Sequence, residues 1–104
     1  MKVLKNHIHI GIEKPFTILH ASDTHIAYAD DRNDERKVKL AEQRTEHFPE
    51  ARENLEFLKN KSTAENRTII YTGDLIDFVS ELNIEKAKEF TDSADIFMAA
   101  GNHE

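Results

Sequence analysis

Three short apolar runs, each followed at once by polar residues, most constrain how this chain can fold. They cover residues 16–21, 68–72 and 95–100, and the glycines Gly73 and Gly101 close the second and third runs. Their length and their β-branched and aromatic content are typical of buried strands. The stretches between them are long enough to cross from one strand to the next. The chain is therefore expected to form a layered sheet-and-helix domain.

Between these runs, apolar side chains recur at helical spacing. The spacing predicts helices over residues 49–60 and 82–92, with a possible short helix before the first. Pro49 suits the first helical position, where its missing N–H carries no penalty. The charged run at residues 30–37 is typical of a solvated loop or an exposed helix start. Strands that alternate with helices predict an α/β fold with βαβ units and a mainly parallel sheet.

Residues 3–12 alternate, with isoleucines on one face and histidines on the other. This period of two predicts a half-buried strand. Residues 13–15 include a proline and predict a turn, so the segment could form a hairpin with residues 16–21. The expected order of elements is β-β-α-β-α-β.

Polar side chains follow each of the three apolar runs. Asp23 and His25 follow the first run, Asp74 follows the second, and Asn102 and His103 follow the third. Ligands bind outside the carboxyl ends of the strands in open α/β sheets, and neighbouring parallel strands lie about 4.8 Å apart. We therefore expect these five residues to share one small site. Their oxygen and nitrogen donors suit Mn, Fe, Zn or Mg.

The spacing within this set suits a pair of ions. Asp23 and His25 are two residues apart, so on extended backbone they point to the same side and could share one ion. The two carboxylate oxygens of Asp74 could bridge two ions. Paired metals about 3.5–4 Å apart can activate water and stabilise an in-line displacement at phosphorus. Gly73 and Gly101 would let the backbone approach such a site closely.

Three motifs carry a resemblance to a known family. D-x-H at residues 23–25, G-D-x-x-D at 73–77 and G-N-H-E at 101–104 occur in this order, each after a predicted strand. Together they resemble the first three motifs of the calcineurin-like metallophosphoesterase superfamily. The resemblance runs from about residue 16 to residue 104. It implies a four-layer α/β/β/α sandwich and a two-metal hydrolysis of a phosphate ester.

The resemblance also implies a ligand set. Asp23 and His25 would bind the first of two divalent metal ions, Asp74 would bridge both ions, and Asn102 would bind the second. The metal could be Mn, Fe, Zn or Mg. By this count, the 104 residues carry only part of each ion's ligand set, so at most weak or partial metal binding is expected from them alone.

Three further residues receive roles by the same resemblance. His103 would be the catalytic residue that orients or protonates the leaving group. Asp77 and Glu104 match positions that support the ligands, and carboxylates of this kind hold ligand histidines in the right tautomer. For Asp77, a helix N-terminal cap is an equally good interpretation. The segment from Tyr28 to Arg44 could be part of a lid or an ordinary loop.

The sequence departs from the family pattern at its end. The family has two further motifs downstream, a ligand histidine and G-H-x-H, and these do not occur within residues 1–104. The earlier histidines cannot replace them on motif grounds: His7 and His9 fit a strand surface, His20 a strand flank and His47 a helix start. We expect residues 1–104 to be the N-terminal portion of one metallophosphoesterase domain, truncated inside G-N-H-E. The open face of its sheet should make the fragment self-associate.

The predicted function is that of a metal-dependent phosphoesterase in the full-length parent protein, with the fragment inactive. The alternative is a non-catalytic half-domain that binds metal or a partner. The substrate class stays open between monoesters, diesters, nucleotides and phosphoproteins. A net charge of −6 disfavours sequence-independent nucleic-acid binding. No apolar stretch reaches membrane-spanning length, and the absence of cysteine and of a signal peptide fits a cytoplasmic protein.

Overall fold

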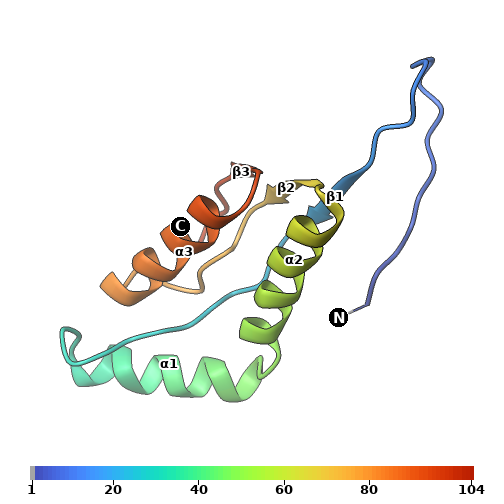
Figure 1. Cartoon of the computed structure of the whole chain (residues 1–104). Helices are drawn as coiled ribbons and strands as arrows, with labels where there is room; N and C mark the ends of the chain where they lie inside the picture. Colours follow the sequence, from blue (N-terminus) through green and yellow to red (C-terminus); the bar gives the residue numbers. More distant parts are fainter. Residues whose placement is uncertain (1) are drawn as a thin grey trace.

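The computed structural model describes residues 2–104 and places three strands and three helices among them (Figure 1). In chain order these elements are β1 (Ile18–Ala21), α1 (Glu35–His47), α2 (Ala51–Glu65), β2 (Thr68–Thr72), α3 (Glu81–Ser93) and β3 (Ile96–Ala99). The strands form one parallel sheet in the order β1-β2-β3, with β2 in the centre. The predicted α/β class and parallel sheet are confirmed.

The core lies between the sheet and two helices. Ile69 and Tyr71 of the central strand are fully buried, and Leu55 of α2 and Phe90 of α3 pack in the same cluster. The rings of Tyr71 and Phe90 meet edge to face, with centroids 6.1 Å apart. Burying each large side chain of this kind stabilises the fold by about 1.5–3 kcal/mol. This packing fixes β2, and with it the loop that follows β2.

The opposite face of the sheet is open among the described residues. Side chains alternate along a strand, so those that do not face the helices face the other way. There, Ile18 of β1 is 45% exposed and Phe97 of β3 is 67% exposed. This agrees with the expectation that the helices cover one side of the sheet and leave an apolar face on the other.

The predicted N-terminal strand is wrong. Residues 3–12 form no strand, and Ile8 and Ile10 are 80% and 70% exposed. The segment runs away from the sheet and the helices (Figure 1), so the expected hairpin is absent too. A period of two describes a chain that could bury one face, but a strand also needs a neighbour to pair its N–H and C=O groups. The described residues provide no such neighbour here.

The helical region before β2 differs from its prediction. The helix expected over residues 49–60 is α2, which begins two residues after Pro49 and runs on to Glu65. The possible short helix before it is the thirteen-residue α1. His47 ends α1, although the sequence placed it at a helix start.

Local hydrogen bonds explain these helix ends. The Asp34 side chain accepts from the Lys37 N–H at 2.9 Å and caps the start of α1, so the charged run leads into this helix. Asn66 adopts the left-handed conformation that commonly ends a helix, with φ of 49°, and stops α2. Ser80 accepts from the Asn83 N–H at 3.1 Å and caps α3.

Candidate metal centre

The loops that follow β1 and β2 run side by side beyond the ends of these strands. The Asp23 N–H donates to the Gly73 carbonyl, and the His25 N–H donates to the Asp74 carbonyl, both at 3.0 Å. An isolated parallel bridge between Ile26 and the second loop continues the pairing. Main-chain bonds therefore hold the D-x-H segment against the G-D-x-x-D segment, so that their side chains face one site.

Three of the residues in these loops have an unusual backbone conformation. Asp23, His25 and Asp74 have positive φ angles of 56°, 50° and 53°. A left-handed conformation costs about 1–2 kcal/mol for a residue with a Cβ atom, although Asp and His tolerate it better than most. Such strain persists where the surroundings enforce it, and it gathers at functional sites.

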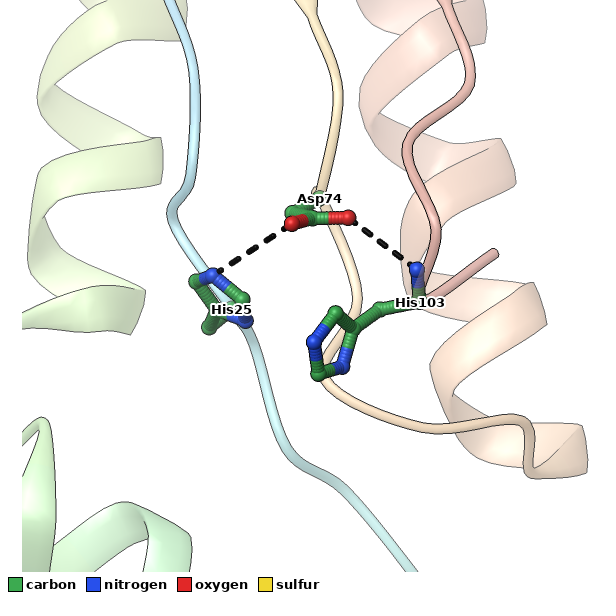
Figure 2. Close-up of side chains that lie close together, drawn as sticks. All are labelled: His25, Asp74 and His103. Carbon is green, nitrogen blue, oxygen red and sulfur yellow. Dashed lines mark hydrogen bonds and ion pairs between the residues drawn. The ribbon is translucent and has the colours of Figure 1, made fainter.

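His25, Asp74 and His103 form the centre of the site (Figure 2). Each of them offers a ligand atom, and these atoms all lie within 4.8 Å of one another. His25 Nε2 lies 3.8 Å from Asp74 Oδ2, and the His103 N–H donates to Asp74 Oδ1 at 3.1 Å. The rings of His25 and His103 are edge-on, with centroids 4.9 Å apart. Imidazole nitrogens and a carboxylate suit a borderline divalent ion, so these residues fit the predicted metal.

The other two predicted ligands lie at the edge of this cluster or outside it. Asp23 Oδ1 is 3.8 Å from His25 Nε2, and the Asp23 side chain is 60% exposed. Asn102 is exposed, and among residues 2–104 no hydrogen bond ties its side chain to another group. The structure therefore brings His25, Asp74 and His103 together with Asp23 at their edge, while Asn102 lies at the surface. The ligand roles of Asp23 and Asn102 stay predictions.

Asp77 lies behind His25 and is almost fully buried, with 4% of its side chain exposed. Its Oδ1 is 3.2 Å from His25 Nδ1, and its Oδ2 is 3.0 Å from Arg44 Nε. Capping of a helix is the alternative interpretation of Asp77, and it is wrong because Ser80 caps α3. Sequence reasoning missed Arg44, because nothing around it on α1 distinguishes it from the other charged residues of that helix.

His103 is oriented by the main chain of Asp77. Its Nδ1 lies 2.6 Å from the Asp77 carbonyl oxygen, which can only accept, so Nδ1 carries the proton. This hydrogen bond, helped by the nearby Asp74 and Asp77 carboxylates, raises the pKa of His103 above its usual value, although burial and Arg44 oppose the shift. Nε2 is left as the nitrogen that can bind a ligand or exchange a proton.

The Glu104 side chain joins the loop after β3 to the loop after β2. Its carboxylate accepts from the backbone N–H groups of Asp74, Leu75, Ile76 and Gly101. Successive N–H groups that converge in this way form an anion-binding nest. Gly101 allows the close approach, because a Cβ atom there would lie 2.1 Å from Asp74 Oδ1. Glu104 thus contacts the backbone of the loop after β2 and of its own loop through four hydrogen bonds.

An open cavity lies beside the cluster. It has a volume of about 440 Å³ and lies between the Asp23 loop and the turn that joins α1 to α2. Phe48 lies on its wall and stacks against the His25 ring, with centroids 6.0 Å apart. The cavity therefore adjoins the cluster at Asp23 and at Phe48.

Comparisons with known proteins fit this geometry. The family model of the calcineurin-like phosphoesterases matches residues 16–104. No curated protein and no solved structure gave a significant match. Among residues 2–104, no helix combines the length and the apolar character that a membrane crossing requires. The match covers nearly the whole chain and includes all three motifs, and the chain therefore belongs to the calcineurin-like phosphoesterase family of metal-dependent hydrolases.

Proposed function

We propose that the complete protein hydrolyses a phosphate ester at a divalent metal centre built on the ends of this parallel sheet. The observation that carries the proposal is the meeting of His25, Asp74 and His103, whose ligand atoms lie within 4.8 Å of one another. They come from three separate loops of a phosphoesterase-family chain. Unrelated surface side chains are not expected to bring two imidazoles and a carboxylate from three loops this close together.

The residues divide the work between binding and proton transfer. His25 and Asp74 would hold metal with Asp23 beside them, and the family resemblance assigns a second ion to Asn102. A bound divalent ion would supply Lewis acidity and a more acidic water molecule. Asp74 offers two carboxylate oxygens for the bridging role. Oδ2 faces Nε2 of His25, and Oδ1 accepts from the backbone N–H of His103.

His103 would handle the leaving group. Its Nδ1–H is engaged by the Asp77 carbonyl, so any proton that it passes on must be carried by Nε2. The hydrogen bond to the Asp77 carbonyl raises the pKa of His103 above its usual value, and this favours the protonated ring, which is the form that can donate to the oxygen of a departing alcohol. The nearby cavity gives the organic part of the ester a place to lie.

The test is hydrolysis of p-nitrophenyl phosphate and bis(p-nitrophenyl) phosphate by the complete protein with added Mn²⁺. Asp74→Asn should abolish turnover. Asp92→Asn is the matched control, because Asp92 is exposed on α3, away from the cluster, and forms an ion pair with Lys88. A wild-type protein that is inert on both esters with Mn²⁺, Fe²⁺, Zn²⁺ and Mg²⁺ would refute the enzyme proposal.

A second candidate is a non-catalytic module, and the open sheet face favours it. Ile18 and Phe97 expose apolar surface there, which is typical of an association surface. For the 104-residue chain by itself, we propose self-association through this face and no appreciable hydrolysis. Robust turnover by the purified 104-residue chain would contradict this proposal, and a monomer in gel filtration at high concentration would contradict the association.

A further inference from the structure

We propose that Arg44 of α1 is a positioning residue that holds both site histidines through Asp77. The inference rests on the proposed function, because it concerns how His25 and His103 are prepared for metal and substrate. Its basis is the chain of contacts from Arg44 to Asp77 and from Asp77 to the two imidazoles.

The first link is the pair formed by Arg44 and Asp77. The Asp77 side chain is 4% exposed, so its carboxylate has little water to solvate its charge. A buried carboxylate needs a countercharge, and Arg44 Nε supplies one at 3.0 Å from Oδ2. Arg44 itself is 42% exposed, so its guanidinium spans from solvent to this buried oxygen.

The second link is the contact of Asp77 with His25. Oδ1 of Asp77 lies 3.2 Å from Nδ1 of His25. Both Nδ1 of His25 and Nε of Arg44 are buried, and neither has an aligned hydrogen bond within the described residues. The carboxylate lies close to both atoms without bonding either of them well.

The third link runs through the backbone of the same residue. The Asp77 carbonyl accepts from Nδ1 of His103 at 2.6 Å, so one residue faces the Nδ1 atoms of both rings. A proton on Nδ1 of His25 leaves its Nε2 with a free lone pair, and this Nε2 lies 3.8 Å from Asp74 Oδ2. A displacement of Asp77 would therefore move both imidazoles together.

The residue type matters as well as the charge. Arginine presents a planar fork of N–H groups whose geometry is fixed, whereas lysine is a compact charge on a flexible stem. Arg44→Lys should keep the countercharge and lose the fixed direction. Arg44→Met should lose both. The two variants therefore separate the contribution of charge from that of geometry.

The first experiment measures Mn²⁺ binding to the 104-residue chain by calorimetry and by electron paramagnetic resonance. We expect Arg44→Met to weaken binding by about 10–100-fold, the usual effect of removing a group that supports a ligand, and Arg44→Lys to fall between it and wild type. Arg36→Met is the matched control, because Arg36 is an exposed arginine of the same helix. It should bind Mn²⁺ as the wild type does.

The second experiment needs no metal. Long-range ¹⁵N–¹H spectra at pH 8.5 report which ring nitrogen carries the proton. His25 should be the Nδ1–H tautomer in wild type and in Arg36→Met, and a mixture of tautomers in Arg44→Met. Arg44→Gln, which keeps a polar N–H group, replaces the methionine variant if that variant does not fold.

The outcomes separate the two proposals. An Arg44 variant that is folded and has unchanged His25 tautomers and unchanged Mn²⁺ affinity overturns the role of Arg44 and leaves the phosphoesterase proposal standing. If the wild type binds no Mn²⁺, the metal centre is contradicted. If the Arg44 variant then still loses the His25 tautomer preference of the wild type, the positioning role is supported. Unchanged tautomers with no Mn²⁺ binding would refute the positioning role as well.

Discussion

Replacing Glu104 by glutamine tests how the loops of the site are held together. Four backbone N–H groups donate to this carboxylate. Those of Asp74 and Gly101 lie 3.1 and 2.7 Å away, and those of Leu75 and Ile76 lie 2.5 and 3.3 Å away. A carboxylate can accept all four of them. A carboxamide can accept at one oxygen only, and its NH₂ group would face donors.

The magnitude follows from the number of bonds lost. Two of the four N–H groups donate to Oε1 of Glu104 and two donate to Oε2, so the amide must leave two of them without an acceptor whichever way it turns. A hydrogen bond to a charged group contributes about 1.5–3 kcal/mol. We expect Glu104→Gln to lower the free energy of unfolding by about that amount, a large share of the ~5–15 kcal/mol that stabilises a typical domain.

The assay is urea unfolding of the 104-residue chain followed by circular dichroism at 222 nm. With a slope of about 1–3 kcal/mol per molar urea, the midpoint should fall by roughly 0.5–3 M. Glu89→Gln is the control, because Glu89 is exposed and makes an ion pair with Lys86 on the surface of α3. Such a pair is worth little, so this midpoint should stay near that of wild type. Equal midpoints for Glu104→Gln and Glu89→Gln would refute the reasoning.

Three further predictions concern the same loops. Gly101→Ala would put a Cβ atom 2.4 Å from the Asp74 backbone N, so it should lower the free energy of unfolding in urea by about 1–3 kcal/mol and weaken Mn²⁺ binding. A variant with the stability and the Mn²⁺ affinity of the wild type would contradict this. Tyr71→Phe removes the hydroxyl that accepts from the Thr24 backbone N–H at 3.0 Å, so it should lower the free energy of unfolding by about 1–3 kcal/mol in the same assay. An unchanged free energy of unfolding would contradict this. In metal-free protein, the NMR titration midpoint of His103 should lie above 6.5 and should fall in Asp74→Asn, which removes a nearby negative charge. Because this pKa is raised by folding, the stabilisation it brings is complete below the unfolded pKa and is lost as pH rises through the folded value; a midpoint at or below 6.5 would contradict the assignment.

The sequence was sufficient to predict the three paired strands and the end of the sheet where chemistry gathers. Residues 68–72 form a short apolar and β-branched run that pairs with a strand on each side and buries Ile69 and Tyr71, and such a run is easily recognised in a sequence. Parallel strands also bring their carboxyl ends to one edge, so the motifs that follow β1, β2 and β3 had to meet there. Topology and motif order together therefore predicted where His25, Asp74 and His103 would converge.

The same reasoning failed where the outcome depends on a distant partner. Residues 3–12 alternate as well as a strand does, but no strand among residues 2–104 lies beside them to complete the hydrogen bonds. Arg44 belongs to the site only because α1 packs where its guanidinium reaches Asp77. The absence of a strand partner and a side-chain contact between two distant elements both depend on the tertiary fold, so neither leaves a local signal in the sequence.

The backbone of the ligand loops explains why the motif residues must be what they are. The positive φ angles of Asp23, His25 and Asp74 would suit glycine, which has no Cβ atom to clash. Glycine would relieve the strain but would remove the carboxylate or imidazole that the proposed metal centre needs. Aspartate and histidine are among the few side chains that accept this conformation and also bind metal. The chain therefore keeps strained residues at the site, and the main-chain bonds between the loops, together with the Glu104 carboxylate, are what hold them there.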